Sequence, residues 1–175
     1  MDLEVLYEDN HILAVNKHSG DLVQSDAEGT LGLEDEIKDF IKVRDDKPGE
    51  VFLGVVHRLD RPVSGVVVFA KTSKALGRLN EMFRTKEVKK TYWAIVQSPP
   101  SAPQGRLENY LWRNEKQNKS YVCRPGSARK DAKLAKLNYR QIARTDRYWL
   151  VEVELLTGRH HQIRCQLSNL GCPIK

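Results

Sequence analysis

The sequence contains little that would indicate secretion, membrane insertion or metal binding. Its 175 residues include three cysteines. This odd number does not suit a disulfide framework, and Cys123, Cys165 and Cys172 lack the close pair spacing of a metal site. No apolar run is long enough to span a membrane, and the N-terminal residues lack the basic-then-apolar order of a secretory signal. We therefore expect reduced thiols in a cytoplasmic protein, with no metal and no membrane partner.

Internal repeats and low-complexity tracts are also absent, and the proline-rich segment 98–105 is too short to link two domains. A chain of 175 residues with 40% hydrophobic and 30% charged residues is typical of a soluble globular protein that can bury a core. These features predict a single domain, 1–175, and we expect a monomer.

Basic residues outnumber acidic ones, which gives a net charge of +6 and a pI of about 9.2. Such an excess suits a polyanionic partner such as nucleic acid, although many basic proteins bind none. Lysine and arginine are plentiful at 84–90 and 113–140. They suit phosphate contacts along an RNA groove and equally suit a solvated face, and the sequence does not separate the two.

The hydrophobic pattern predicts more strands than helices. Alternating or short apolar runs indicate strands, and apolar residues at helical spacing indicate helices, one of them with Ser73 as its N-cap. The predicted strands are 3–7, 12–15, 66–70, 89–96 and 148–155, with a hairpin over 106–123; the predicted helices are 31–43, one following Ser73, and 163–170. Residues 132–143 fit helix or strand on pattern alone. Without regular strand–helix–strand repeats, the order favours an α+β fold with a mixed, largely antiparallel sheet flanked by helices.

One segment, HRLDRPVSGVVVFAK over 57–71, is the most informative. It places Asp60 between Arg58 and Arg61, follows it with a proline and a Ser-Gly pair that predict a turn, and then enters a buried strand. Side chains two apart in an extended segment share a face, so Arg58 and Asp60 should project together. A neighbouring guanidinium favours the ionised form of an acid. On its own, Asp60 could equally be a turn aspartate that bonds its own backbone.

This segment resembles the active-site motif of the RluA-type RNA pseudouridine synthases, with Val63 where threonine is usual. Three further blocks occur in the order that the family shows. They are LYEDNHILAVNKHSG at 6–20, with His18 in place of a common proline; KKTYWAIV at 89–96; and LLTGRHHQIRCQLSNLGCPI at 155–174. In the last block Cys165, Gln166 and Cys172 replace commoner valine and histidine. The resemblance covers nearly the whole chain and implies the pseudouridine synthase fold, with residues 132–143 as a strand.

The implied reaction isomerises uridine in ribosomal or transfer RNA to pseudouridine. The bond from the ribose to N1 of uracil breaks, the base turns, and a bond to C5 forms. Nothing is oxidised or hydrolysed, so the reaction calls for no cofactor and no metal. It calls for one carboxylate and a closed pocket, whereas a glycoside hydrolase would use a pair of carboxylates. The resemblance assigns the carboxylate to Asp60.

The resemblance also implies roles for five other residues. Arg58 contacts the RNA and fills the space left when the target base flips out, unless it is merely a surface partner of Asp60. Tyr92 packs against the target base, although a tyrosine in a strand is more often a core residue. Arg164 pairs with the catalytic aspartate, for which a planar guanidinium is well suited. Lys90 and Arg159 are expected to bind RNA.

Three expectations complete this account. The adjacent His160 and His161 should point in different directions, which makes them RNA-facing or structural rather than metal ligands. The chain begins directly at the catalytic domain, with no RNA-binding domain in front, and stops at Lys175, where the family continues with a further strand and helix. A catalytically silent RNA-binding relative is the main alternative to an enzyme, and an unrelated basic β-rich binding module is a remote third.

Overall fold

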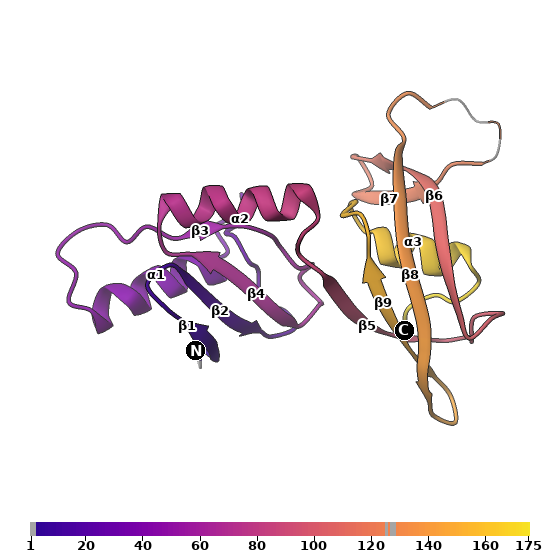
Figure 1. The fold of residues 1–175 in the computed structure, drawn as a ribbon, viewed down its shortest axis with the longest axis horizontal. Helices are drawn as coiled ribbons and strands as arrows, with labels where there is room; N and C mark the ends of the chain where they lie inside the picture. The colour runs from indigo at the N-terminus through magenta and orange to yellow at the C-terminus, as the bar shows by residue number, and fades with distance from the viewer. Residues whose placement is uncertain (1–2, 125, 127–128) are drawn as a thin grey trace. The chain divides into compact units, whose positions relative to one another are not determined.

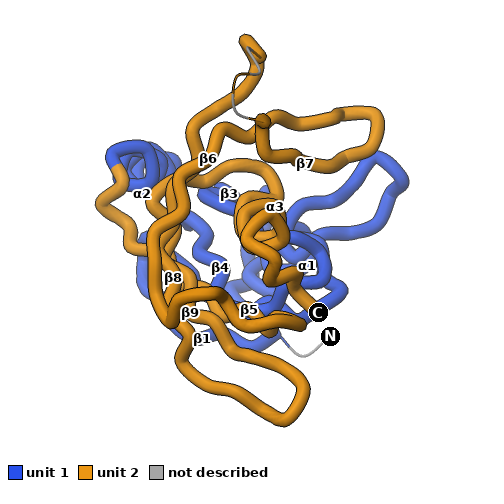
Figure 2. Tube along the Cα trace, turned by 90° about the vertical axis from the view of Figure 1, so that its right-hand side faces the viewer, with its two compact units in different colours: residues 1–85 blue, residues 86–175 orange. Residues whose placement is uncertain are grey.

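The computed structural model describes residues 3–124, 126 and 129–175. The chain divides into two compact units, residues 1–85 and 86–175 (Figure 2). Each unit has its own antiparallel sheet and its own hydrophobic core (Figure 1). Among the described residues, no helix has the length and apolar character needed to cross a lipid bilayer.

The first unit is a four-stranded sheet with two helices. Its elements are β1 (Val5–Glu8), β2 (Ile12–Lys17), α1 (Leu33–Arg44), β3 (Gly54–Val55), β4 (Gly65–Ala70) and α2 (Ser73–Thr85). The strands lie in the order β1-β2-β4-β3, so β4 is paired on both sides. Ile37 and Ile41 of α1 pack with Val67 and Phe69 of β4 in the core of this unit. The strand that follows the Asp60 turn is therefore held rigidly in the middle of the sheet.

The second helix packs closely against the short strand β3. A Cβ placed on Gly54 would lie 2.8 Å from the Leu76 side chain, so a larger residue at this position would require that side chain to shift. The hydroxyl of Thr72 accepts the backbone N–H of Ala75 at 3.1 Å. The prediction of Ser73 as the N-cap is therefore wrong by one position. Both residues carry a capping hydroxyl, and the strand end at Ala70 fixes which of them precedes the first turn.

The second unit is a five-stranded sheet with one helix. Its elements are β5 (Lys90–Val96), β6 (Gln104–Asn114), β7 (Lys119–Val122), β8 (Lys133–Arg144), β9 (Trp149–Leu155) and α3 (Gln162–Asn169). The strands lie in the order β5-β9-β8-β6-β7, and each strand pairs with its neighbours in antiparallel orientation. Leu167 of α3 is fully buried against Leu137, Val151 and Val153. One face of the sheet is thus covered by α3, while side chains of the other face, such as Trp93 and Ile95, are exposed.

The predicted α+β fold with antiparallel strands is confirmed, and the strands are distributed over two sheets. Residues 132–143 form a strand, as the resemblance implied, because β8 lies between β6 and β9 and pairs with both. The hairpin over 106–123 and the last helix are also present. The assignment of 1–175 to a single catalytic domain stays a prediction.

Candidate active site

Asp60 lies in a tight turn immediately before the central strand of the first unit. Its carbonyl accepts the backbone N–H of Val63 at 2.9 Å, which closes the turn over Arg61 and Pro62. Gly65 then begins β4 with a φ of +132°, a conformation that residues with a side chain rarely adopt. The predicted turn is therefore present, and Asp60 is half-buried within it.

The segment 17–20 packs directly against this turn. The N–H of Gly20 donates to the carbonyl of Arg61 at 2.8 Å, and Nε of Arg61 donates to the carbonyl of Gly20 at 3.0 Å. The hydroxyl of Ser19 donates to the carbonyl of Pro62 at 2.9 Å. Two motifs that are some 40 residues apart in the sequence therefore form one structural unit around Asp60.

Lys17 is fully buried where these two segments meet. Its ammonium donates to three backbone carbonyls, including those of Val63 at 2.6 Å and Arg61 at 3.1 Å. Burial lowers the pKa of Lys17, while the charges of Asp21 and Asp60 act in the opposite direction. Lys17 thus holds the turn by its backbone and places a positive charge where it interacts with the Asp60 carboxylate.

The start of the motif is held by His57. Its Nε2 accepts the backbone N–H of Val68 in β4 at 3.1 Å, and its ring stacks on Phe83 of α2 at 5.1 Å. Because Nε2 is the acceptor, the ring proton belongs on Nδ1. Arg58, by contrast, is exposed and donates to Oε1 of Gln24 at 3.4 Å. This solvent-facing position is compatible with the RNA contact that was predicted for Arg58.

In the second unit, Lys90 and Tyr92 lie on the same face of β5. Tyr92 is half-buried and packs against the core of this unit. Burial lowers the pKa of Lys90, and the charge of Lys86 lowers it further. A Cβ placed on Gly158 would lie 3.7 Å from Nζ of Lys90. The ammonium of Lys90 is therefore next to the loop that carries Arg159.

Arg159 and Arg164 flank the start of α3, and both are exposed. Nε of Arg159 donates to the carbonyl of Leu134 at 3.0 Å. The side-chain oxygen of Gln162 accepts the N–H of Arg159 at 3.0 Å and the hydroxyl of Thr157 at 2.8 Å. These bonds fasten the loop between β9 and α3 to β8, and they fix the backbone positions from which both arginines project.

A buried amide network supports this loop from below. Gln162 and Gln166 are almost completely buried. Nε2 of Gln162 donates to Oε1 of Gln166 at 3.0 Å, and Nε2 of Gln166 donates to Oδ1 of Asn109 at 2.8 Å. Buried amides need such partners, because an unmade hydrogen bond there costs about 1–3 kcal/mol. The amide of Gln166 thus satisfies both of its polar neighbours, Gln162 and Asn109.

The expectation that His160 and His161 point in different directions is wrong. Their ring centroids are 3.7 Å apart. His161 adopts the left-handed conformation, with a φ of 50°, at the start of α3. His160 also lies with Nδ1 2.9 Å from the hydroxyl of Ser120. Within the described part of the chain, no group of three or more histidines, cysteines and acids is placed to hold a metal ion.

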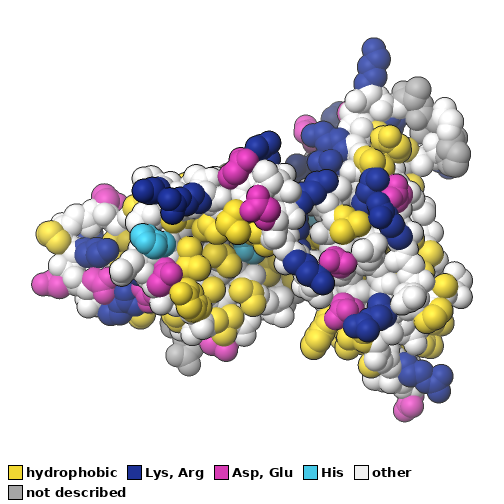
Figure 3. Space-filling view, in the orientation of Figure 1, with side chains coloured by type: hydrophobic (Ala, Val, Ile, Leu, Met, Phe, Trp, Pro, Cys, Tyr) yellow, Lys and Arg dark blue, Asp and Glu magenta, His cyan; other side chains and the backbone are white. Residues whose placement is uncertain are grey.

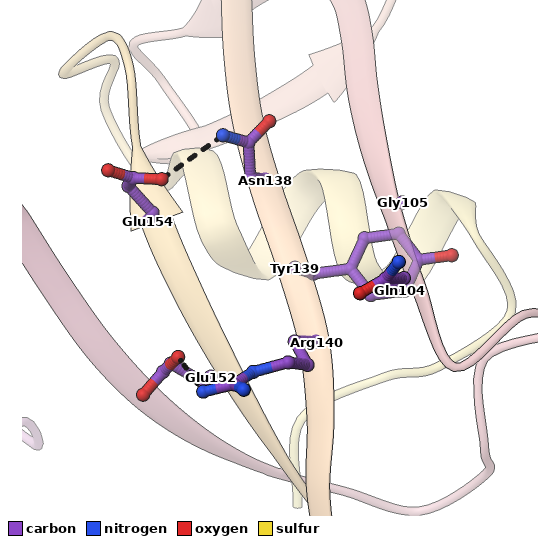
Figure 4. A pocket seen from close by; sticks show the side chains of 7 residues that line it. All are labelled: Gln104, Gly105, Asn138, Tyr139, Arg140, Glu152 and Glu154. Carbon is purple, nitrogen blue, oxygen red and sulfur yellow. Dashed lines mark hydrogen bonds and ion pairs between the residues drawn. The ribbon is translucent and has the colours of Figure 1, made fainter.

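A polar hollow of about 450 Å³ lies on the second unit and contains none of the predicted site residues (Figure 4). Its charged side chains are paired: Arg140 donates to Glu152 at 3.0 Å, and Asn138 donates to Glu154 at 3.1 Å. Lys89 lies 3.5 Å from Glu154 as well. The hollow is thus lined by neutralised pairs on the sheet surface, which gives no reason to place chemistry there.

The comparisons with known proteins identify the family. Residues 11–169 match the RNA pseudouridylate synthase family, and the chain belongs to this family, in its RluA-type branch. A solved human protein, RNA pseudouridylate synthase domain containing 4, superposes with a TM-score of 0.83 at 29% identity, over 98% of this chain and 66% of that one. Human RNA pseudouridylate synthase domain containing 1 shares the fold, with a TM-score of 0.76 at 22% identity.

Curated bacterial relatives agree. The chain is 32% identical over 176 residues to the uncharacterized RNA pseudouridine synthase YhcT of Bacillus subtilis, covering 99% of this chain and 56% of that protein. It is 32% identical over 170 residues to ribosomal large subunit pseudouridine synthase C of Escherichia coli, covering 97% and 50%. It is 32% identical to tRNA pseudouridine synthase C of Pectobacterium carotovorum, covering 98% and 46%. The chain therefore spans about half the length of these relatives.

The six predicted site residues fall into two groups. Arg58 and Asp60 share one turn of the first unit. The second unit carries Lys90 and Tyr92 on β5, and Arg159 and Arg164 at the start of α3. Sequence reasoning missed the role of Lys17. A signal was available, because Lys17 continues the alternation of the buried Leu13 and Val15 along β2 and therefore points into the core.

Proposed function

We propose that this protein is an RNA pseudouridine synthase that isomerises uridine in ribosomal or transfer RNA, with Asp60 as its essential catalytic group. The observation that carries the proposal is the Asp60 turn, a half-buried carboxylate fastened by two motifs before a central strand. Family membership and the names of the relatives, which include ribosomal and transfer RNA enzymes, support the substrate class.

The proposed reaction balances without any co-reactant. The bond between C1′ of the ribose and N1 of uracil breaks, the base rotates, and C1′ bonds to C5. The proton on C5 leaves, and N1 takes up a proton, so the product is an isomer of the substrate. Asp60 acts at the sugar, either as a nucleophile at C1′ or as a base that removes a ribose proton. Both routes need this carboxylate ionised.

The other predicted residues have supporting roles in this proposal. Arg58 enters the space that the flipped uridine vacates. Tyr92 packs against the base and assists proton transfer at C5, and Arg164 contributes a guanidinium to the reaction. Lys90 and Arg159 bind RNA phosphates, which position the substrate without reading its sequence. A monomeric state and a cytoplasmic location remain predictions.

Release of tritium from RNA labelled at C5 of uridine tests the function, because C5 loses its hydrogen only when the new bond forms. Total RNA from a strain that lacks the gene serves as the substrate. We expect release with the unsubstituted protein and a loss of at least a thousandfold with Asp60→Asn. Binding of RNA by Asp60→Asn, measured by filter retention, should stay within about twofold, because removing one acid does not weaken phosphate contacts.

Two outcomes would contradict the proposal. Retention of more than a tenth of the activity by Asp60→Asn would remove this residue from the chemistry. RNA binding by the unsubstituted protein without any tritium release would instead favour the silent RNA-binding relative. Asp46→Asn is a matched control, because Asp46 is an exposed turn acid in the same unit; its activity should be unchanged.

A further inference from the structure

The positive charge of this protein is concentrated in one short segment. Residues 110–133 contain seven lysines and arginines and two acids, a net charge of +5, whereas the whole chain has a net charge of +6. The segment comprises the end of β6, β7 and the loop toward β8, and all seven basic side chains are exposed. Basic side chains stand out around β7 and this loop in Figure 3.

Three aromatic side chains share one face of the same hairpin. Trp112 and Tyr121 are cross-strand partners, and their rings stack at 5.2 Å with an interplanar angle of 27°. Tyr110 precedes Trp112 by two residues and therefore lies on the same face. Tyr110 is 57% exposed and Tyr121 is 38% exposed. The opposite face of β6 turns inward, since Leu111 is buried.

Hairpin stability does not explain this arrangement. A cross-strand aromatic pair contributes about 0.2–1 kcal/mol, which accounts for Trp112 and Tyr121 but not for the exposed ring of Tyr110. The guanidinium of Arg129 lies 3.8 Å above the Trp112 ring while it pairs with Asp131. The aromatic cluster therefore already accepts one flat cationic group by stacking.

We propose that this hairpin face, defined by Tyr110, Trp112 and Tyr121, binds unpaired nucleotides of the substrate RNA. The exposed tyrosine rings stack with bases, and the surrounding lysines and arginines contact phosphates. Aromatic side chains within a basic surface are the combination that single-stranded nucleic acids recognise, whereas paired bases have no free faces to stack. The inference rests on the proposed function only for the identity of the natural RNA.

Binding is tested with the full chain carrying Asp60→Asn, so that no probe is modified. The probes are a fluorescent 20-nucleotide oligouridylate, an abasic strand with the same number of phosphates, and a paired RNA duplex of that length. One variant, Tyr110→Ala with Tyr121→Ala, removes the stacking rings. A second, Lys116→Gln with Lys119→Gln, removes two charges from the hairpin. Urea unfolding first confirms that each variant is folded.

Loss of the tyrosine rings should weaken oligouridylate binding about tenfold or more, since stacking on one aromatic ring contributes about 1–3 kcal/mol. The abasic strand should lose less than twofold, because it has no bases to stack. Loss of the two lysines should weaken both strands, and should reduce the slope of log affinity against log salt by about 1.4, at about 0.7 for each phosphate contact.

Matched controls lie in the first unit. Tyr7→Ala removes an equally exposed tyrosine, and Lys42→Gln with Lys47→Gln removes two exposed lysines. These variants should bind every probe within about twofold of the parent, because surface substitutions away from a binding site change little.

Three results would overturn the inference. They are no measurable binding of oligouridylate, equal losses for the oligouridylate and the abasic strand after the tyrosine substitutions, and an unchanged salt slope after the lysine substitutions.

The proposed function is judged separately. Tritium release by the unsubstituted protein, together with unchanged binding by the hairpin variants, would refute this inference alone. If the unsubstituted protein released no tritium while the hairpin variants bound oligouridylate more weakly, the proposed function alone would be refuted.

Discussion

Lys17 offers the most direct test of how the fold positions Asp60. In Lys17→Met the side chain keeps a similar volume, but three backbone carbonyls lose their charged donor, including those of Arg61 and Val63 within and after the turn. A hydrogen bond to a charged group contributes about 1.5–3 kcal/mol, so the gross loss is about 5–9 kcal/mol. Part of this free energy is recovered, because the variant no longer buries a charged ammonium. The unfavourable effect of that burial is seen in the lowered pKa of Lys17.

The expected net loss in the free energy of unfolding is about 2–4 kcal/mol, a large share of the usual 5–15 kcal/mol of a domain. Urea unfolding followed by circular dichroism measures it, and the midpoint should fall by about 1–2 M. In conditions where the variant is folded, kcat should fall more than KM rises, because the displaced turn moves Asp60 while leaving RNA contacts in place.

Lys47→Met is the matched control, since Lys47 is exposed in a loop of the same unit. Its stability should change by less than about 0.5 kcal/mol. A midpoint for Lys17→Met within about 0.2 M of the unsubstituted protein would refute the argument, because it would mean that the turn keeps its place without the ammonium.

Two further predictions concern stability. Arg44, through its hydrogen bonds, together with Lys71, lowers the pKa of Glu8 from 4.5 to about 2. The contribution of Glu8 to the free energy of unfolding is therefore complete above pH 4.5 and is lost as the pH falls toward 2, so Glu8→Gln should cost about 1–2 kcal/mol at pH 7 after allowance for solvent screening. In thermal unfolding, the difference in stability between Glu8→Gln and the unsubstituted protein should disappear by about pH 2, and a difference that stays constant with pH would contradict the assignment. Gln166→Leu should cost about 1–3 kcal/mol in urea unfolding, because Asn109 loses its donor, whereas Gln166→His should cost less; equal costs would argue against the amide network.

The elements that could be predicted from the sequence are those with a local signature. The turn at Asp60 has proline and glycine at fixed offsets, and α1 has apolar residues at helical spacing with acids first and bases last. The strand 133–144 lacks such a signature, because its apolar spacing also suits a helix. Pairing with β6 and β9 on its two sides decides the conformation. The distribution of the strands over two sheets is likewise a property of pairing, not of local pattern.

The candidate site divides in the same way. Residues that are proposed to carry chemistry, such as Asp60, could be named because their motif is continuous in the sequence. Residues that hold them could not, because they act over long separations. Lys17 bonds to carbonyls 44 and 46 residues away, and the amide of Gln166 bonds to Asn109, 57 residues earlier.

These supporting contacts have a common physical feature that a sequence motif does not reveal. The Lys17 contacts are made to backbone carbonyls, which every residue type has, and the Gln166 contact is made to an amide group, which more than one residue type has. The identity of the partner therefore cannot be recognised in the sequence. What the sequence does show is the residue that makes the contact, as an ionisable or amide side chain at a position whose neighbours along the strand or helix are buried. Lys17 after Val15, and Gln166 beside Leu167, are such positions. Because a buried polar side chain must find a partner, each indicates a long-range contact before the structure shows which one.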